Sequence, residues 1–146
     1  MEKVIFKDGK RVSARGIIIK DDSVYLMFRR RIKDDGSIKE YYVVPGGGID
    51  EGEDEEVAVK REMKEELSVN VKILGKVGCD EGENSIANFY HLRITRGKPQ
   101  LGGEEKEKNC ESNFYEIRLV KIDDLDKIDV TGADYIRKAY NKEYLS

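Results

Sequence analysis

A glycine run followed by closely spaced acidic residues is the part of this chain that could perform chemistry. The run reads Gly46-Gly47-Gly48-Ile49-Asp50-Glu51-Gly52-Glu53, and it leads to Arg61-Glu62-Met63-Lys64-Glu65-Glu66-Leu67. Carboxylate and carbonyl oxygens are the ligands that hard divalent cations prefer, and glycine lets a backbone approach phosphates closely. The two parts together predict a site that holds a divalent cation against a phosphate chain.

The acidic residues need a helix to bring them together, and the sequence predicts one over 54–67. Asp54 is a suitable N-cap, acids follow in the first turn, and apolar residues recur every four positions. At about 100° per residue, Glu62, Glu65 and Glu66 share one face without a lysine in the same arc. Repulsion between these three carboxylates destabilises the helix. We therefore interpret the face as a metal-binding one and not as a solvated surface.

The spacing between the glycines and the acids resembles the Nudix box of the Nudix hydrolases. That box is a glycine, five residues, a glutamate, seven residues and R-E-U-x-E-E-x-G-U, where U is a bulky aliphatic residue. The segment from Gly47 to Val69 meets eight of the nine specified positions. Ser68 stands where the box has its last glycine, at a helix end where a left-handed residue is usual. Either Ser68 accepts that conformation, the helix ends differently, or Asn70 takes the left-handed role.

The resemblance assigns a role to each matching residue. It implies that Glu62, Glu65 and Glu66 hold Mg²⁺ or Mn²⁺, with the carbonyl of Gly46 completing the coordination. It also implies a scaffold role for the remaining box positions, which are Gly47, Glu53 and Arg61, the last two as an ion pair. The catalytic proton acceptor varies within the family, so Glu62 and Glu65 in the box and Glu104 and Glu105 in the later 102–108 segment are all candidates.

The substrate-binding residues are less well determined by the sequence. Arg29 and Arg31 share one side of a strand and are candidates for phosphate binding, and Tyr42 is a candidate for stacking on a base. An exposed basic strand end and a core tyrosine are the competing interpretations. We expect a structural or solvent-facing role for His91.

The elements around the box predict a mixed α and β chain. Strands are expected over 17–19, 24–28, 41–44, 69–77, 87–94 and 114–120, a short turn over 122–125, a charged loop over 102–108 and a closing helix over 134–145. This order resembles the family's α/β/α sandwich around a mixed sheet. We therefore expect an α/β (α+β) fold and a single Nudix domain over 1–146.

Composition limits the possible partners and surroundings. The chain has 27 basic and 30 acidic residues. This small excess of negative charge argues against general nucleic-acid or membrane-surface binding. Cys79 and Cys110 are far apart and no signal-like segment precedes them, so we expect a cytoplasmic protein without a disulfide framework. We also expect a monomer or homodimer. The resemblance implies a metal-dependent pyrophosphohydrolase that cleaves a nucleoside diphosphate linked to another moiety. A non-catalytic nucleotide-sensing or interaction module is the alternative.

Overall fold

The computed structural model describes residues 4–145, apart from the side chains of Glu104 and Glu105. Its strands are β1 (Phe6–Lys7), β2 (Lys10–Lys20), β3 (Ser23–Ile32), β4 (Ile38–Val43), β5 (Gly46–Gly48), β6 (Asn70–Glu81), β7 (Ser85–Arg96) and β8 (Asn113–Lys121). Its helices are α1 (Glu55–Leu67), α2 (Gly103–Lys108), the 3₁₀ helix η1 (Ile122–Lys127) and α3 (Ala133–Tyr140). The expected α+β class is confirmed.

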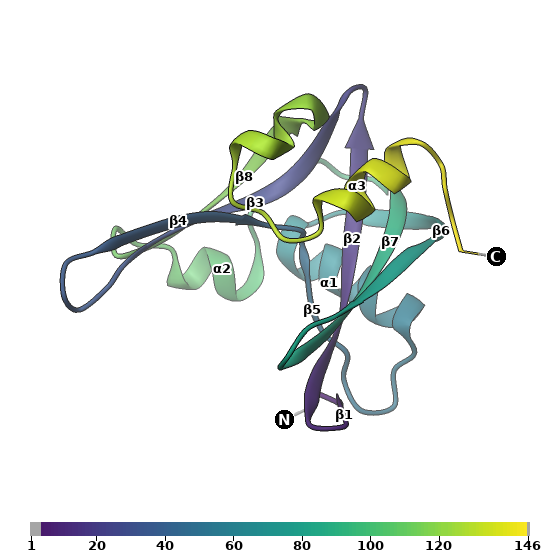
Figure 1. Ribbon diagram of the computed structural model, residues 1–146, viewed down its shortest axis with the longest axis horizontal. Coiled ribbons are helices and arrows are strands. Elements are labelled where there is room, and N and C mark those ends of the chain that lie inside the picture. The colour runs from purple at the N-terminus through teal and green to yellow at the C-terminus, as the bar shows by residue number, and fades with distance from the viewer. Residues whose placement is uncertain (1–3, 146) are drawn as a thin grey trace.

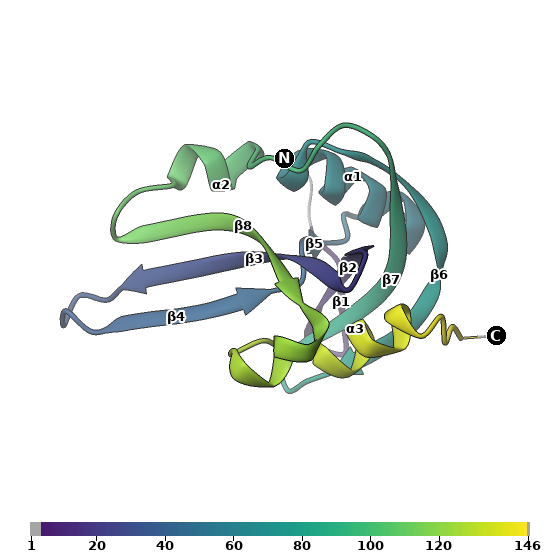
Figure 2. The same ribbon diagram turned by 90° about the horizontal axis from the view of Figure 1, so that it is seen from above.

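The strands form one mixed sheet in the order β4-β3-β2-β7-β6. Strands β2 and β7 run parallel, and the neighbouring pairs run antiparallel. Figure 2 shows α1 and α3 on opposite sides of the sheet, as the expected sandwich requires. Because side chains alternate along a strand, Ile17 joins the core under α3 while Ile18 joins the core under α1.

Helix α1 begins and ends as its sequence predicts. The Asp54 carboxylate accepts a hydrogen bond of 2.8 Å from the Val57 N–H, which caps the first turn. Val59, Met63 and Leu67 are fully buried against the sheet. Burying each of these side chains stabilises the fold by roughly 1.5–3 kcal/mol, which fixes the rotation of the helix and therefore the direction of its acidic face.

A three-stranded arm, made of β4, β3 and β8, leaves the body of the sheet (Figures 1 and 2). Strand β3 pairs with β4 from Met27 to Ile32 and with β8 from Ser23 to Arg31. Its pairing with β2 covers Ile19 with Val24 and Lys20 with Ser23, next to the turn. The arm therefore diverges from β2, and β5 pairs with β2 where the two separate.

Two sequence predictions about secondary structure are wrong, and strand β5 was not predicted. In β5, the backbone of glycines 46–48 pairs with Ser13–Arg15 of β2. The 102–108 segment contains helix α2 and not a loop, because its glutamate and lysine residues favour helix. The closing helix stops at Tyr140, since Lys142 is left-handed and the Leu145 N–H bonds to the Lys76 carbonyl of β6 at 2.8 Å.

The expected turn and strands are found in the structure. The short turn expected over 122–125 is η1, and each expected strand is present with shifted bounds, β4 ending at Val43 and β6 beginning at Asn70. Cys79 and Cys110 are free and exposed. Within the described residues, no helix is long and apolar enough to cross a membrane.

Candidate active site

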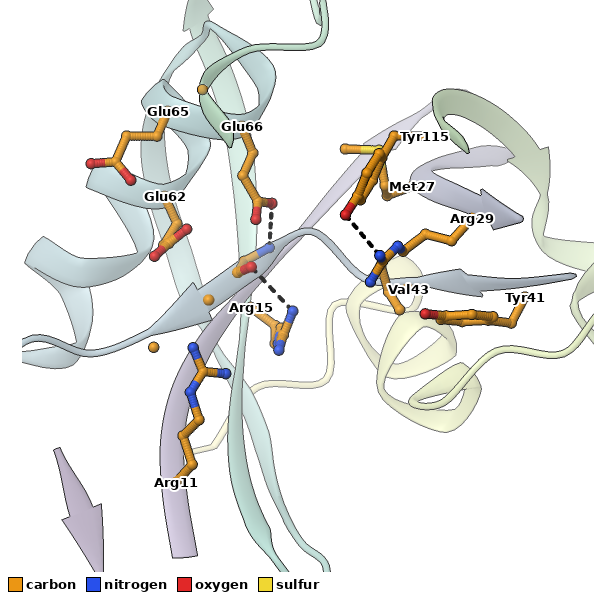
Figure 3. Close-up of a pocket in the computed structure, with 14 residues that line it drawn as sticks. Arg11, Arg15, Met27, Arg29, Tyr41, Val43, Glu62, Glu65, Glu66 and Tyr115 are labelled. Atoms are coloured by element: carbon orange, nitrogen blue, oxygen red, sulfur yellow. Dashed lines mark hydrogen bonds between the residues drawn. The ribbon is translucent and has the colours of Figure 1, made fainter. Parts of the chain in front are cut away.

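A cavity of about 730 Å³ lies between the acidic face of α1, β5 and the inner face of the arm (Figure 3). The residues that line it are Arg11, Arg15, Met27, Arg29, Tyr41, Val43, Gly46, Gly47, Gly48, Glu62, Glu65, Glu66, Gly103 and Tyr115. It thus gathers residues from β2, β3, β4, β5, α1, α2 and β8. Arginines and glutamates meet here, as a site for a cation and phosphates requires.

The three glutamates of the acidic face all line this cavity. Glu62 is buried, Glu66 is half-buried, and Glu65 is exposed. Burial raises the pKa of Glu62, and the charge of Glu65 raises it further, while Arg61 and Arg15 act in the opposite direction. Burial disfavours the charged form of Glu62, and a bound cation would stabilise that form.

Arg61 joins the glycine loop to the acidic face. Its guanidinium donates to both oxygens of Glu53, at 2.7 and 2.8 Å, which is the ion pair that the box predicts. It also donates to Glu62 at 3.0 Å, to Glu65 at 3.2 Å and to the Gly48 carbonyl at 3.0 Å. These bonds hold the pKa of Glu53 below its usual range and fix two of the site carboxylates in place.

The glycines of β5 let the backbone reach the acids. Gly46 has φ +149°, and a Cβ there would collide with the Ala14 carbonyl of β2. Its N–H donates to the Glu66 carboxylate at 2.9 Å. A Cβ on Gly47 would lie 2.6 Å from Oε1 and 2.7 Å from Oε2 of Glu62. Any larger residue at Gly47 would therefore displace that carboxylate.

Two arginines of the cavity, Arg11 and Arg15, were not singled out from the sequence. They come from β2, where Arg11, Ser13 and Arg15 alternate with apolar residues and so share one face. Arg15 donates through Nη1 to the carbonyls of Gly46 at 3.1 Å and Val44 at 3.3 Å. The alternation can be recognised in the sequence. The pairing of β2 with β5 cannot, because the two strands lie far apart along the chain.

Of the proposed substrate-binding residues, Arg29 lines the cavity, while Arg31 and Tyr42 do not. Arg29 lies 4.3 Å from the ring centre of Tyr115 and 5.7 Å from that of Tyr41. Its Nη2 donates to the Tyr115 hydroxyl at 2.8 Å, and its buried Nε has no hydrogen-bond partner in the described part of the chain.

Strand register explains why Tyr41 takes the place expected for Tyr42. Tyr41 lies opposite Arg29, whereas Tyr42 lies opposite Phe28, whose side chain faces away from the cavity. Tyr42 packs on Phe28 with ring centres 5.2 Å apart and accepts a hydrogen bond from Arg118 at 3.0 Å. Arg31 shares the face of Arg29 but lies farther out on the arm and is exposed.

Ser68 adopts the left-handed conformation of the missing glycine. Its φ and ψ are 60° and 33°, and its N–H bonds to the Met63 carbonyl. Asn70 instead begins β6, so the alternative role for it is wrong. The loop between β7 and α2 is hydrogen-bonded to the same end of α1. The Gln100 N–H donates to the Leu67 carbonyl at 2.9 Å, and the Gly102 N–H donates to the Glu66 carbonyl at 3.1 Å.

These bonds place the start of α2 beside the cavity, where Gly103 is part of the lining. The side chains of Glu104 and Glu105, two candidate proton acceptors, lie outside the described residues. His91 is buried in β7, and its Nδ1 lies 2.7 Å from the Tyr144 hydroxyl. Burial, together with the charge of Lys142, lowers the pKa of His91, so a structural role fits it.

The donor set suits a hard divalent cation. Three glutamates and Gly46 line one cavity, and the Glu62 carboxylate lies against the backbone of Gly47. Within the described part of the chain, no three acidic, histidine or cysteine side chains are grouped so that they could hold a metal ion on their own. Mg²⁺ usually keeps several waters and takes few protein ligands, so an open set of this chemistry fits it.

Comparison with known proteins identifies the family. The NUDIX domain model matches residues 9–139, so the chain belongs to the NUDIX domain family. It is similar to a solved structure described as a MutT NUDIX hydrolase from Burkholderia pseudomallei, with a TM-score of 0.66 and 25% identity. That alignment covers 90% of this chain and 96% of the other.

Curated relatives carry two different names. One from Caulobacter vibrioides, named RNA pyrophosphohydrolase, is 40% identical over 80 residues, which are 47% of this chain and 46% of that protein. Another from Methanocaldococcus jannaschii, named ADP-ribose pyrophosphatase, is 30% identical over 102 residues, which are 66% and 58% of the two chains. The chain thus spans about half the length of the first of these curated relatives.

Proposed function

We propose that this protein is a metal-dependent pyrophosphohydrolase that hydrolyses a nucleoside diphosphate linked to another moiety. The observation that carries the proposal is the meeting of Glu62, Glu65 and Glu66 with three arginines in one cavity. Membership of the NUDIX family and the names of the relatives support the reaction class. A single Nudix domain, a cytoplasmic location and a monomeric or homodimeric state belong to the same proposal.

The carboxylates and the Gly46 carbonyl are the residues that would hold Mg²⁺ or Mn²⁺. When bound, such an ion polarises phosphate oxygens and lowers the pKa of a coordinated water. Arg11, Arg15 and Arg29 neutralise the charge of the phosphates and orient them, because guanidinium groups pair well with phosphate oxygens. Arg61 keeps Glu62 and Glu65 in position through its two hydrogen bonds to them.

In the reaction, a water oxygen forms a new bond to one phosphorus of the anhydride, and the bond from that phosphorus to the bridging oxygen breaks. The departing phosphate carries the bridging oxygen away as an anion, and the proton of the water passes to a carboxylate. Glu62 suits that last step, since its raised pKa makes it a stronger base than an exposed glutamate. Glu65, Glu104 and Glu105 remain the other candidates for this role.

The inner face of the arm supplies the part of the cavity that can recognise the substrate's nucleoside. Tyr41 and Tyr115 flank Arg29 there, and an aromatic ring can stack on a base. The names of the relatives suggest two kinds of substrate, an RNA end and ADP-ribose. Both contain a phosphoric anhydride next to a nucleoside, which is the chemical unit that the cavity suits.

A panel of substrates with Mg²⁺ or Mn²⁺ tests the proposal. It would contain ADP-ribose, other nucleoside diphosphate sugars, nucleoside triphosphates and a short RNA with a 5′-triphosphate, with released phosphate and nucleotide measured. We expect turnover of at least one compound and a loss of about a hundredfold or more in Glu66→Gln, since one site carboxylate is removed. Tight binding without release, unaltered by Glu66→Gln, would contradict the enzyme and support the non-catalytic module.

A further inference from the structure

Arg15 stands between two cavities that meet at β2. Besides the active-site cavity, it lines a smaller one of about 180 Å³ together with Arg11 and Val43. The other residues of the smaller cavity are Ser13, Val44, Asp80, Ser85, Ala87, Phe89 and Thr131. Among the described residues, Arg15 is therefore one of three that border both cavities.

The guanidinium of Arg15 also holds the backbone group that is proposed as a metal ligand. Its Nη1 donates to the Gly46 carbonyl at 3.1 Å, while the N–H of the same glycine donates to Glu66 at 2.9 Å (Figure 3). Gly46 is thus hydrogen-bonded to the Arg15 guanidinium through its carbonyl and to the Glu66 carboxylate through its N–H. Any ion bound to that carbonyl becomes a close neighbour of the guanidinium.

Arg15 keeps donors for an anion. In the part of the chain that the structure describes, its hydrogen bonds are made through Nη1, to the Gly46 and Val44 carbonyls. Guanidinium carries five N–H donors, so those of Nη2 and Nε are left for a ligand in the cavities that Arg15 lines. Phosphate oxygens are suitable acceptors for this planar arrangement of donors.

The surroundings of Arg15 disfavour the charged form of its guanidinium. Burial lowers the pKa of its guanidinium, Glu66 and Glu62 oppose that effect, and the nearby Arg11 adds to it. A divalent cation at the Gly46 carbonyl would add a second positive charge in a poorly solvated place, where repulsion is strong. A phosphate group placed between the two cations removes this conflict, because each cation then faces a negative oxygen.

We propose that Arg15 couples metal binding to pyrophosphate binding: it weakens the binding of a divalent cation to the free protein and strengthens it once a pyrophosphate is present. The inference rests on the proposed function, because it takes the Gly46 carbonyl as a metal ligand. It adds a role that the family box does not contain, since Arg15 lies on β2, outside the segment from Gly47 to Val69. Linkage requires that the cation strengthen pyrophosphate binding by the same factor.

The test measures binding and not turnover. Free Mn²⁺ is followed by electron paramagnetic resonance, with and without the α,β-methylene analogue of ADP, whose P–C–P bridge resists hydrolysis. In the wild-type protein we expect the analogue to strengthen Mn²⁺ binding by about tenfold or more. In Arg15→Gln we expect Mn²⁺ alone to bind several-fold more tightly and the gain from the analogue to fall below about threefold.

Two further variants make the result specific. Arg15→Lys keeps a positive charge but cannot span two carbonyls and an anion together, so we expect an intermediate gain. Arg93→Gln removes an exposed arginine on β7, opposite Lys72 and away from both cavities, and it should match the wild type. Chelation of Mn²⁺ by the analogue in buffer is the same in every sample, so differences between variants report on the protein. Circular dichroism and thermal unfolding show that each variant is folded.

The outcomes separate this inference from the function on which it rests. If the wild-type protein turns over a substrate but Arg15→Gln keeps the wild-type Mn²⁺ affinity and the wild-type gain, the coupling is wrong and the enzyme stands. If Arg15→Gln binds Mn²⁺ more weakly without the analogue, Arg15 assists the carbonyl and does not oppose the cation, which also overturns the inference. If the wild-type protein shows neither turnover nor Mn²⁺ binding, the proposed function fails and the coupling with it.

Discussion

The carboxylate of Glu53 and the guanidinium of Arg61 are joined by two parallel hydrogen bonds of 2.7 and 2.8 Å. The same guanidinium donates to Glu62 and Glu65, so the loop before α1 and the acidic face of α1 share one cation. Glu53 also accepts from the Asp50 N–H at 2.9 Å, which closes the loop. The ion pair therefore helps to position Glu62 and Glu65, although Glu53 itself does not line the cavity.

The first prediction concerns Glu53→Gln. The variant keeps an acceptor for the Asp50 N–H but loses the charged pair, so we expect the free energy of unfolding at pH 7 to fall by about 2 kcal/mol. The folded-state pKa of Glu53 is depressed, so its stabilising effect is present above the ordinary glutamate pKa and is lost as the pH falls below about 4. Urea unfolding at pH 7 and pH 3 measures this. Glu51→Gln, in the exposed part of the loop, is the control and should change little.

The second prediction gives the neighbouring Glu62 the opposite pH dependence. Its folded-state pKa is raised by burial, so the charged form costs stability once the pH exceeds the ordinary glutamate pKa. Glu62→Gln keeps an acceptor for Arg61 and removes the buried charge. We expect its melting temperature to exceed that of the wild type at pH 7 and the difference to vanish below about pH 4, where both states bind the proton.

The same Glu62→Gln variant should lose activity in the substrate panel, since a site carboxylate is removed. Gain of stability with loss of activity is the mark of a residue kept for function. Equal or lower stability at pH 7 would mean that the bond from Arg61 outweighs the burial cost, and the interpretation of Glu62 as a strained, functional carboxylate would be wrong.

The sequence predicted those parts of the site that lie close together along the chain. Helix α1, its Asp54 cap and the pair of Glu53 with Arg61 depend on contacts within one helix and its adjoining loop, whereas the conformation of Ser68 was left open between three alternatives. Capping, helical spacing and box spacing are local signals, so they can be recognised without knowing the fold.

The parts that were missed depend on contacts between distant segments. Arg15 reaches the site because β5 pairs with β2, and Tyr41 replaces Tyr42 because of the register between β4 and β3. A shift of one residue moves every side chain of a strand to the other face, and a single sequence does not fix that register. The family resemblance supplied the order of the strands but not their register or the divergence of the arm.

The third prediction concerns Ser68, the irregular position of the box. Its left-handed backbone costs a non-glycine residue roughly 1–2 kcal/mol. We expect Ser68→Gly to raise the free energy of unfolding by about 1 kcal/mol and the melting temperature by roughly 3 °C. Activity should stay within about tenfold of the wild type, because the helix end is already formed and the acidic face does not move.

The control for this variant is Asn70→Gly. Asn70 begins β6, where glycine lowers stability by roughly 0.5–1 kcal/mol, so the two glycine variants should shift the melting temperature in opposite directions. A Ser68→Gly protein that is no more stable would show that the serine backbone is not strained. An activity gain of more than about tenfold would show instead that Ser68 impairs the native site.

The last prediction uses the close approach of β5 to α1. A Cβ on Gly47 would lie 2.6 Å from the Glu62 carboxylate, closer than such atoms can approach. Gly47→Ala must therefore displace the Glu62 carboxylate from its present position, in which we propose that it holds a cation. We expect Mn²⁺ affinity, measured by isothermal titration calorimetry, to fall by about tenfold or more, which corresponds to a loss of about 1.4 kcal/mol of binding free energy.

Gly82→Ala is the matched control, since the nearest atom to its Cβ is 3.6 Å away, an ordinary contact in the turn after β6. Unchanged Mn²⁺ affinity in a folded Gly47→Ala protein would mean that Glu62 is not a metal ligand, and the proton acceptor would then be its remaining role in the site.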